Sequence, residues 1–250
     1  MSAIVTLLTD FGTSDGYVAE MKGRLLRLTT DITIVDVAHD IAPGDVEAAA
    51  YVLGRTWRAF PDATVHVAVV DPGVGTPRRA LAAEAGGHRF VAPDNGLLTC
   101  VADHAPLTAV VLPVPDSASP TFHGRDVFAP AAAALANGAA LATLGAPTDV
   151  VNRLPLPMAR RSEVGVVGTI VHVDRFGTLI TNIPAEMIAA TAIVQLAARV
   201  VPISSTFGDV APGEVVAFTG SGGTLEIAVR DGRADEVLGV GRGTDVLLTG

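Results

Sequence analysis

Short apolar runs alternate with amphipathic stretches along the first half of the chain. The strand-like runs are residues 4–8, 33–37, 64–70, 80–84, 89–92 and 108–112. Helical patterns predict two helices between these runs, one ending near Leu28 and one over about 45–57, and a third helix after the last run, over 128–135. This alternation is typical of an α/β domain in which helices cover the faces of a mainly parallel sheet.

The pattern changes near residue 145. Prolines 147, 155 and 157 and the pair Arg160-Arg161 predict a linker over 146–163. Helical periodicity then almost disappears, and turn residues separate apolar runs at 164–173, 179–183, 199–203, 214–218, 225–229 and 245–248. The sequence therefore predicts an α/β domain over 1–145 and a small β-barrel domain over 164–250.

Composition and charge narrow the function classes. Hydrophobic residues make up 49% of the 250 residues, which is enough for a substantial core, and the formal net charge is −9. Basic residues do not cluster beyond pairs, so nucleic acid and anionic membranes are poor partners. The one apolar stretch of spanning length, 126–149, is rich in Ala and Gly and is broken by prolines, so we expect no membrane span.

Cysteine usage bears on the compartment. Cys100 is the single cysteine, so no internal disulfide can form, and this fits a reducing cytoplasm. The N-terminus lacks a basic segment followed by an apolar run, and Asp10 comes early. We therefore expect no signal peptide and a cytoplasmic protein.

Polar residues in two glycine-containing loops form the sharpest candidate site. Asp71 stands at the tip of the run 64–70, and Arg78 follows after a turn containing Gly73 and Gly75. His123 lies in the second loop, within Phe122-His123-Gly124-Arg125-Asp126. If the loops meet, an ionised Asp, an Arg and a His could hold and polarise a water. The alternative is a structural ion pair and an unrelated histidine.

Two further acids follow the first predicted strand. Asp10, at the strand end, could accept hydrogen bonds from both hydroxyls of a ribose, or it could cap the next helix. Asp15 is read on sequence alone as a first-turn acid favoured by the helix dipole.

The β-rich part carries a segment suited to a planar base, Asp174–Asn182. An exposed Phe176 beside Gly177 could stack on the base, and Thr178 or Asn182 could bind its edge. An ordinary hairpin is the alternative. Gly220-Ser221-Gly222-Gly223 is either a flexible turn or a backbone cradle for a carboxylate.

A metal centre is a further alternative for the loop acids. His123, Asp126, Asp10, Asp71 and Asp94 are residue types that suit Mg, Mn or Zn. The chain has no His-x-His, no His-Glu-x-x-His and no cysteine pair, so solvated loop acids are favoured over a metal site.

Five motifs carry a family resemblance. They are Leu8-Thr9-Asp10-Phe11-Gly12, Val70-Asp71-Pro72-Gly73-Val74-Gly75-Thr76, Ala92-Pro93-Asp94-Asn95-Gly96, Phe122-His123-Gly124-Arg125-Asp126 and Val173-Asp174-Arg175-Phe176-Gly177. With the turn at Ser221 they extend over nearly the whole chain. On these motifs the chain resembles the S-adenosylmethionine hydroxide adenosyltransferases, or SAM hydrolases, which are relatives of the fluorinases and chlorinases.

The resemblance implies an N-terminal α/β domain joined to a C-terminal β-barrel. It also implies a homotrimer that binds S-adenosylmethionine between the N-domain of one subunit and the C-domain of its neighbour. The implied reaction joins S-adenosylmethionine and water to give adenosine and L-methionine, with no cofactor and no metal.

Residue roles follow from the same resemblance. The water-handling set falls on Asp71, Arg78 and His123, and His123 is expected to take or steer the proton. The implied substrate contacts are Asp10 for the ribose, Asp15 and Asp174 for the methionine ammonium group, Ser221 for its carboxylate, Phe176 and Thr178 for adenine, and Asn182, Glu226 and Val229 as further contacts.

The chain departs from the family pattern at two positions. Thr178 stands where the adenine contact is usually Asn, and Gly222 stands where fluorinases have an Arg. The extra fluorinase loop is lacking, and Asp71, Arg78 and His123 favour water over halide as the nucleophile. Three alternatives stay open: a halide adenosyltransferase, an adenosyl-ligand binding protein without turnover, and a metal-dependent phosphohydrolase.

Overall fold

The computed structural model describes residues 2–250. It divides into two compact units, Met1–Leu154 and Pro155–Gly250, each with its own hydrophobic core. The units are described separately below. Among the described residues, no helix is long and apolar enough to cross a membrane.

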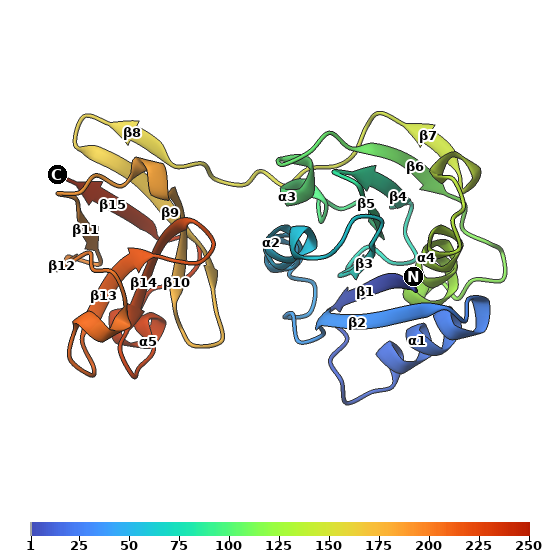
Figure 1. Ribbon diagram of the computed structural model, residues 1–250, viewed down its shortest axis with the longest axis horizontal. Helices are drawn as coiled ribbons and strands as arrows, with labels where there is room; N and C mark the ends of the chain where they lie inside the picture. Colours follow the sequence, from blue (N-terminus) through green and yellow to red (C-terminus); the bar gives the residue numbers. More distant parts are fainter. Residues whose placement is uncertain (1) are drawn as a thin grey trace. The chain divides into compact units, whose positions relative to one another are not determined.

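The first unit is built on a seven-stranded mixed sheet (Figure 1). Its strands are β1 (Ala3–Thr9), β2 (Ile32–Ala38), β3 (Val65–Val69), β4 (Ala80–Ala85), β5 (His88–Pro93), β6 (Thr108–Leu112) and β7 (Ala146–Thr148), in the order β2-β1-β3-β5-β4-β6-β7. The first three pairings in that order are parallel and the last three are antiparallel. The predicted α/β class is confirmed. The sheet is only half parallel because the tight turn at Gly86-Gly87 makes β4 and β5 a hairpin.

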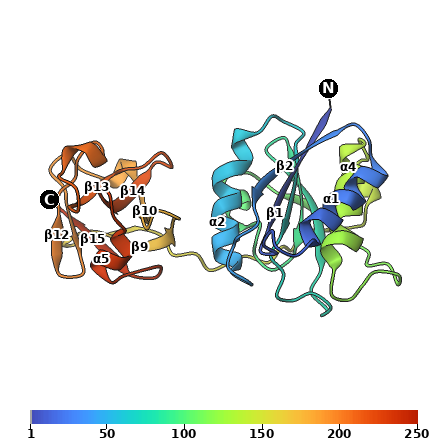
Figure 2. The same ribbon diagram turned by 90° about the horizontal axis from the view of Figure 1, so that it is seen from below.

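Helices cover both faces of this sheet. They are α1 (Tyr17–Leu28), α2 (Val46–Thr56), the short α3 (Thr99–Ala102) and α4 (Ala129–Ala136), with 3₁₀ turns η1 (Trp57–Ala59) and η3 (Leu141–Thr143). Figures 1 and 2 show α1 and α4 on one face and α2 on the other. Met21, Leu25 and Phe128 are in the core on the first face, and Leu53 and Trp57 are in the core on the second. Leu28, which shares the predicted apolar face of α1, is 41% exposed because the helix ends there.

The parallel half of the sheet sets the position of the site. In the β1–β3 ladder Thr9 pairs with Val69, so Asp10 and Asp71 leave the sheet at the same edge. Loops at the carboxyl ends of parallel strands are where such sheets bind ligands.

The second unit is an antiparallel β-barrel. Its strands are β8 (Arg160–Ser162), β9 (Gly165–Val173), β10 (Leu179–Pro184), β11 (Ile193–Leu196), β12 (Arg199–Val201), β13 (Val215–Thr219), β14 (Thr224–Val229) and β15 (Asp245–Thr249), accompanied by α5 (Ala234–Leu238), η4 (Ala185–Met187) and η5 (Phe207–Asp209). The order is β12-β11-β15-β9-β10-β14-β13, with β8 paired to β9. A parallel bridge between Ile203 and Ala217 joins the two ends of the sheet, so the predicted barrel architecture is confirmed.

The segment predicted as a linker, 146–163, is divided between the units. Residues 146–148 form β7, which pairs with β6, and residues up to 154 belong to the first unit. Pro155 onward belongs to the second unit, where β8 pairs with β9.

Candidate active site

Asp71 and Arg78 form a two-point ion pair at the carboxyl end of β3. The Arg78 Nε donates to Asp71 Oδ1 over 3.0 Å, and its Nη2 donates to Asp71 Oδ2. Both side chains are nearly buried, at 7% and 5% exposure. A charge-assisted fork of this kind fixes the carboxylate in orientation as well as in charge.

The turn between these two residues depends on Gly75. Val74 N–H donates to the Asp71 carbonyl, and Thr76 N–H donates to the Gly73 carbonyl, so the chain folds back on itself. Gly75 has φ of +75°, and a Cβ at this position would lie 2.6 Å from the Pro120 carbonyl oxygen. Glycine therefore permits both the turn and its close approach to the loop that leads to His123.

His123 meets the ion pair through Arg78. The Arg78 Nη2 donates to His123 Nδ1 over 3.2 Å, and the histidine is buried at 5% exposure. His123 directly precedes a π-helical turn, η2 (Gly124–Phe128), which continues into α4, and its side chain makes no capping hydrogen bond to that turn. The predicted convergence of Asp71, Arg78 and His123 is thus present in the structure.

The direction of these hydrogen bonds defines the state of His123. Because a guanidinium can only donate, Nδ1 must accept, and the neutral ring carries its proton on Nε2. Burial and the nearby Arg78 charge lower the pKa of His123, while Asp71 and Asp126 oppose that shift. Burial raises the pKa of Asp71 despite the opposing effect of Arg78. The cluster therefore contains a neutral histidine and a carboxylate made more basic by burial.

Asp10 and Asp71 line one pocket of about 510 Å³. The other lining residues are Phe11, Tyr17, Pro43, Gly44 and Pro72. The Gly44 N–H donates to Asp10 Oδ2 over 2.8 Å, so the carboxylate is oriented by the loop before α2. Asp10 does not cap α1, whose N-cap is Gly16, and the alternative of a capping role is excluded.

His39 holds the Asp10 loop in place. Its carbonyl accepts from Gly12 N–H over 2.7 Å, and its Nδ1 lies 2.8 Å from the hydroxyl oxygen of the buried Thr9. On the other side, His39 Nε2 lies 3.0 Å from Asp36 Oδ1. The set resembles a Thr–His–Asp nucleophile triad. However, Thr9 has no exposed surface, and its oxygen already accepts from Phe11 N–H, so the set is structural.

Three aromatic side chains beside the pocket were not predicted as site residues. Phe11, Tyr17 and Phe122 pack edge to face with ring centroids 5.4–6.1 Å apart. Tyr17 is 50% exposed although it is large and partly apolar. The sequence signal that could have found them is that each aromatic lies within a few residues of a candidate site residue.

Asp15 lies before α1 rather than in its first turn. The helix begins at Tyr17, and Asp15 is exposed. The Asp15 carboxylate therefore lies at the surface near Tyr17. Its contact with the methionine ammonium group stays a prediction.

The predicted residues of the second unit gather on β10, β14 and their adjoining turns. Asp174 Oδ1 accepts from the N–H groups of Phe176 and Thr178, which shapes the β9–β10 turn. Phe176 is 76% exposed, whereas Thr178 is buried. Glu226 pairs with Ile180 across β10 and β14.

The remaining predicted contacts differ in their surroundings. The Glu226 carboxylate lies against Gly220, next to Ser221 in the β13–β14 turn. Val229 is buried at the end of β14. Asn182 uses its amide structurally: its oxygen accepts from Thr169 N–H and its nitrogen donates to the Pro157 carbonyl, both over 2.8 Å.

Two of the acids considered for a metal centre are paired with arginines. Asp94 pairs with Arg79, and Asp126 pairs with Arg125. Within residues 2–250, no group of three or more His, Cys, Asp and Glu side chains is arranged to hold a metal ion.

Comparison with known proteins identifies relatives over the whole chain. Residues 5–145 match the SAM hydroxide adenosyltransferase N-terminal domain, and residues 168–247 match its C-terminal domain. A protein from Thermus thermophilus named (R)-S-adenosyl-L-methionine hydrolase is 42% identical and aligns over 98% of both chains. A Salinispora tropica protein of the same name is 41% identical over 98% of this chain and 97% of its own.

A solved structure agrees with these matches. A conserved protein of Thermotoga maritima superposes with a TM-score of 0.92 at 34% identity, covering 98% of this chain and all of the other.

The sequence comparison also finds a more distant relative. A protein from Nocardia brasiliensis named fluorinase is 32% identical over 90% of this chain and 89% of its own.

Proposed function

This chain belongs to the S-adenosylmethionine hydroxide adenosyltransferase family, and we propose that it hydrolyses S-adenosyl-L-methionine to adenosine and L-methionine. The observation that carries the proposal is the Arg78 guanidinium shared between Asp71 and His123. Asp71 also lines the pocket that contains Asp10. A water-handling cluster and a candidate ribose contact therefore meet at one pocket.

The chemistry requires a positioned water and no acid at sulfur. The sulfonium leaves as a neutral thioether when the ribose C5′–S bond breaks and the C5′–O bond forms. Holding the water in line with that bond supplies several kcal/mol of the barrier reduction. Proton removal by a placed base adds roughly 10² to 10⁴ in rate.

We propose that two residues share the handling of the proton, with roles that follow from their hydrogen bonds and pKa directions. Since Nδ1 of His123 accepts from Arg78, the donor that His123 offers to a water is Nε2–H, which orients the oxygen without taking a proton. Asp71, whose pKa is raised by burial, is the group that accepts the proton of the attacking water. His123 thus orients the attacking water, and Asp71 receives its proton.

The relatives' names refine the substrate. Both hydrolases named above carry the (R) descriptor in their names, so we propose that the (R) sulfonium epimer is the preferred substrate of this chain as well. Steady-state rates on separated epimers test this point.

Other parts of the proposal rest on the resemblance alone. Asp15, Asp174, Ser221, Glu226, Val229, Phe176 and Thr178 would contact the methionine and adenine parts. The second-unit residues would come from a neighbouring copy in a homotrimer. No cofactor is expected, and the single cysteine supports a cytoplasmic location.

Adenosine release from S-adenosylmethionine tests the proposal. The wild-type chain should release adenosine with and without chloride, and should retain activity in a chelator. Asp71→Asn should lower the rate by about 10²-fold or more. Asp31→Asn is the matched control, because the same change falls on an exposed acid at the start of β2. Binding without turnover, or 5′-chloro-5′-deoxyadenosine as the main product, would contradict the hydrolase assignment.

A further inference from the structure

The segment Ala92–Gly96 spans the end of β5 and the bend after it, and it has no role in the proposed chemistry. Its two polar members, Asp94 and Asn95, nevertheless face the turn 71–78. Asp94 is 2% exposed and its side chain is fully buried, which is rare for a carboxylate without a specific partner. Both residues contact the backbone immediately outside the turn, and these contacts indicate a role for the segment.

Asn95 holds the first end of the turn. Its Nδ2 donates to the Val70 carbonyl over 2.8 Å, and Val70 directly precedes Asp71. Its Oδ1 accepts from Leu97 N–H over 3.3 Å, which fixes which way the amide faces. The backbone that carries Asp71 is therefore attached to a side chain from the bend that follows the neighbouring parallel strand, β5.

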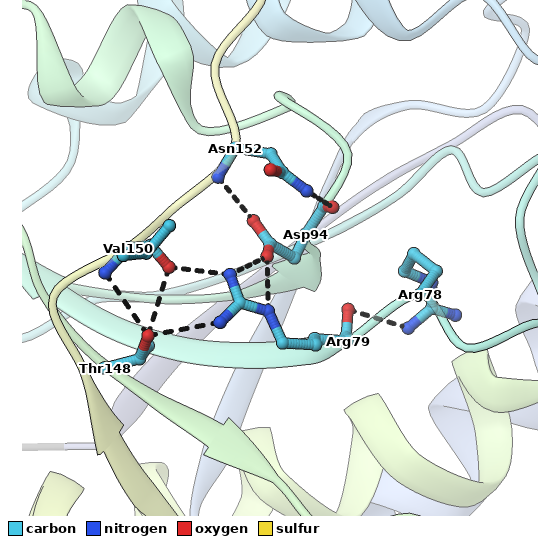
Figure 3. Close-up of polar contacts among 6 residues, drawn as sticks. All are labelled: Arg78, Arg79, Asp94, Thr148, Val150 and Asn152. Atoms are coloured by element: carbon cyan, nitrogen blue, oxygen red, sulfur yellow. Dashed lines mark hydrogen bonds and ion pairs between the residues drawn. The ribbon is translucent and has the colours of Figure 1, made fainter.

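Asp94 holds the other end of the turn. Its N–H donates to the Arg79 carbonyl over 2.9 Å, and its carboxylate accepts from Arg79 Nε over 2.8 Å and from Nη2. The same Arg79 carbonyl accepts from Arg78 Nη1 over 3.1 Å (Figure 3). Asp94 thus fixes a carbonyl that orients the Arg78 guanidinium.

The remaining contacts show that Asp94 does not act in chemistry itself. Its Oδ1 accepts from Asn152 N–H over 2.8 Å, and its carbonyl accepts from Asn152 Nδ2 over 2.8 Å. The Arg79 guanidinium also donates to the Val150 carbonyl and the Thr148 hydroxyl (Figure 3). The Asp94 side chain is fully buried and does not line the pocket of Asp10 and Asp71, so the carboxylate is a fixed anchor rather than a base or a ligand.

We propose that Asp94 and Asn95 are positioning residues that clamp the two ends of the turn 71–78 and so set the geometry of Asp71, Arg78 and His123. The clamp joins Val70 and Arg79, the residues just outside the turn, to two consecutive residues directly after β5. The proposal rests on the proposed function for its catalytic consequence. A displacement of about 1 Å at a reacting group can cost about 10²-fold in rate.

A nearby polar residue provides a matched control. Thr99 is buried like Asp94, at 3% exposure. Its hydroxyl accepts from Leu154 N–H over 2.8 Å and donates to the Gly96 carbonyl over 2.6 Å, and neither bond reaches the turn. Thr99→Val should therefore change stability and leave kcat within about twofold.

The test compares kcat and KM for adenosine release. Asn95→Ala and the isosteric Asn95→Asp should lower kcat by about 10- to 100-fold with KM within about threefold, because the turn moves while the pocket walls stay. Asp94→Asn, which keeps an acceptor for Asn152, should act in the same direction. A kcat within twofold of wild type in the folded Asn95 variants would overturn the proposal.

A readout without turnover separates the clamp from the proposed function. The imidazole ¹⁵N signals of His123, assigned with His123→Asn, report the hydrogen bond from Arg78 to Nδ1. They should shift in Asn95→Ala and Asn95→Asp and stay unchanged in Thr99→Val. Unshifted signals in the Asn95 variants contradict the clamp. Absence of adenosine from wild type, with shifted signals in those variants, contradicts only the proposed function.

Discussion

At the scale of single residues, Arg78 determines how the cluster works. Its planar fork donates to both Asp71 oxygens, to His123 Nδ1 and to the Arg79 carbonyl. A lysine has one nitrogen and cannot make these bonds in one plane. The fork also assigns the histidine tautomer, which the sequence could not, because a residue type does not state which ring nitrogen meets the donor.

The pH dependence of hydrolysis follows from these contacts. Activity should require neutral His123 and ionised Asp71, whose pKa values move in opposite directions, downward from 6.5 and upward from 3.8. As pH falls, kcat/KM should therefore stay constant down to pH 6.5 and then decline between pH 6.5 and pH 3.8. A pH profile of kcat/KM for wild type checks this. An acid limb centred at or above 6.5 would contradict the lowered histidine pKa.

At the scale of elements, turns that contain glycine can be predicted from the sequence, whereas short strands joined by other residues cannot. The turn 71–78 was predictable from the sequence because Gly73 and Gly75 are typical turn residues. Strand β11 was not predicted, because its hairpin turn uses Ala197 and Ala198 at φ of 51° and 60°, where Gly or Asn is the usual signal.

The π-helical turn η2 could not be predicted either. The periodicity gave a helix from 128, but nothing in a residue pattern encodes the wider turn at 124–128. The turn packs closely on α1, since a Cβ at Gly124 would lie 3.1 Å from the Met21 sulfur. Such long-range contacts are set by the fold rather than by neighbouring residues.

Gly75→Ala tests how closely the two loops must approach. The new Cβ would meet the Pro120 carbonyl, so kcat should fall by about tenfold or more as the loop before His123 moves. Gly138→Ala is the matched control, with a similar positive φ of +86° and open space around it. It should cost about 1 kcal/mol of stability and no activity, measured by thermal unfolding and adenosine release. Equal activities of the two variants would contradict the steric argument.

At the scale of the whole molecule, two units with separate cores divide the candidate residues. Asp10, Asp71, Arg78 and His123 belong to the first unit, and Asp174, Phe176 and Ser221 belong to the second. The sequence indicated this division through its loss of helical periodicity. It could not show that residues 146–154 stay with the first unit, because Asp94 and β6, which bind that segment, are distant in sequence.

Mixed assemblies test the proposed sharing of sites between subunits. Asp71→Asn removes a site residue of the first unit, and Asp174→Ala removes a site residue of the second unit. Each variant alone should therefore be nearly inactive. Chains unfolded and refolded together should regain a measurable fraction of wild-type adenosine release, since some sites would receive one intact contribution from each chain. Light scattering should show a trimer. No recovery in a mixture that does form trimers would contradict shared sites.

The ion pair of Asp71 and Arg78 has a consequence for which nucleophiles can enter. The pair is electrically balanced and the adjoining His123 is neutral, while Asp10 accepts its hydrogen bond from a backbone amide rather than from a cation. The pocket wall therefore carries one negative charge in excess. That field favours a sulfonium cation over chloride or fluoride, so we expect an uncharged nucleophile to enter the pocket more readily than an anionic one.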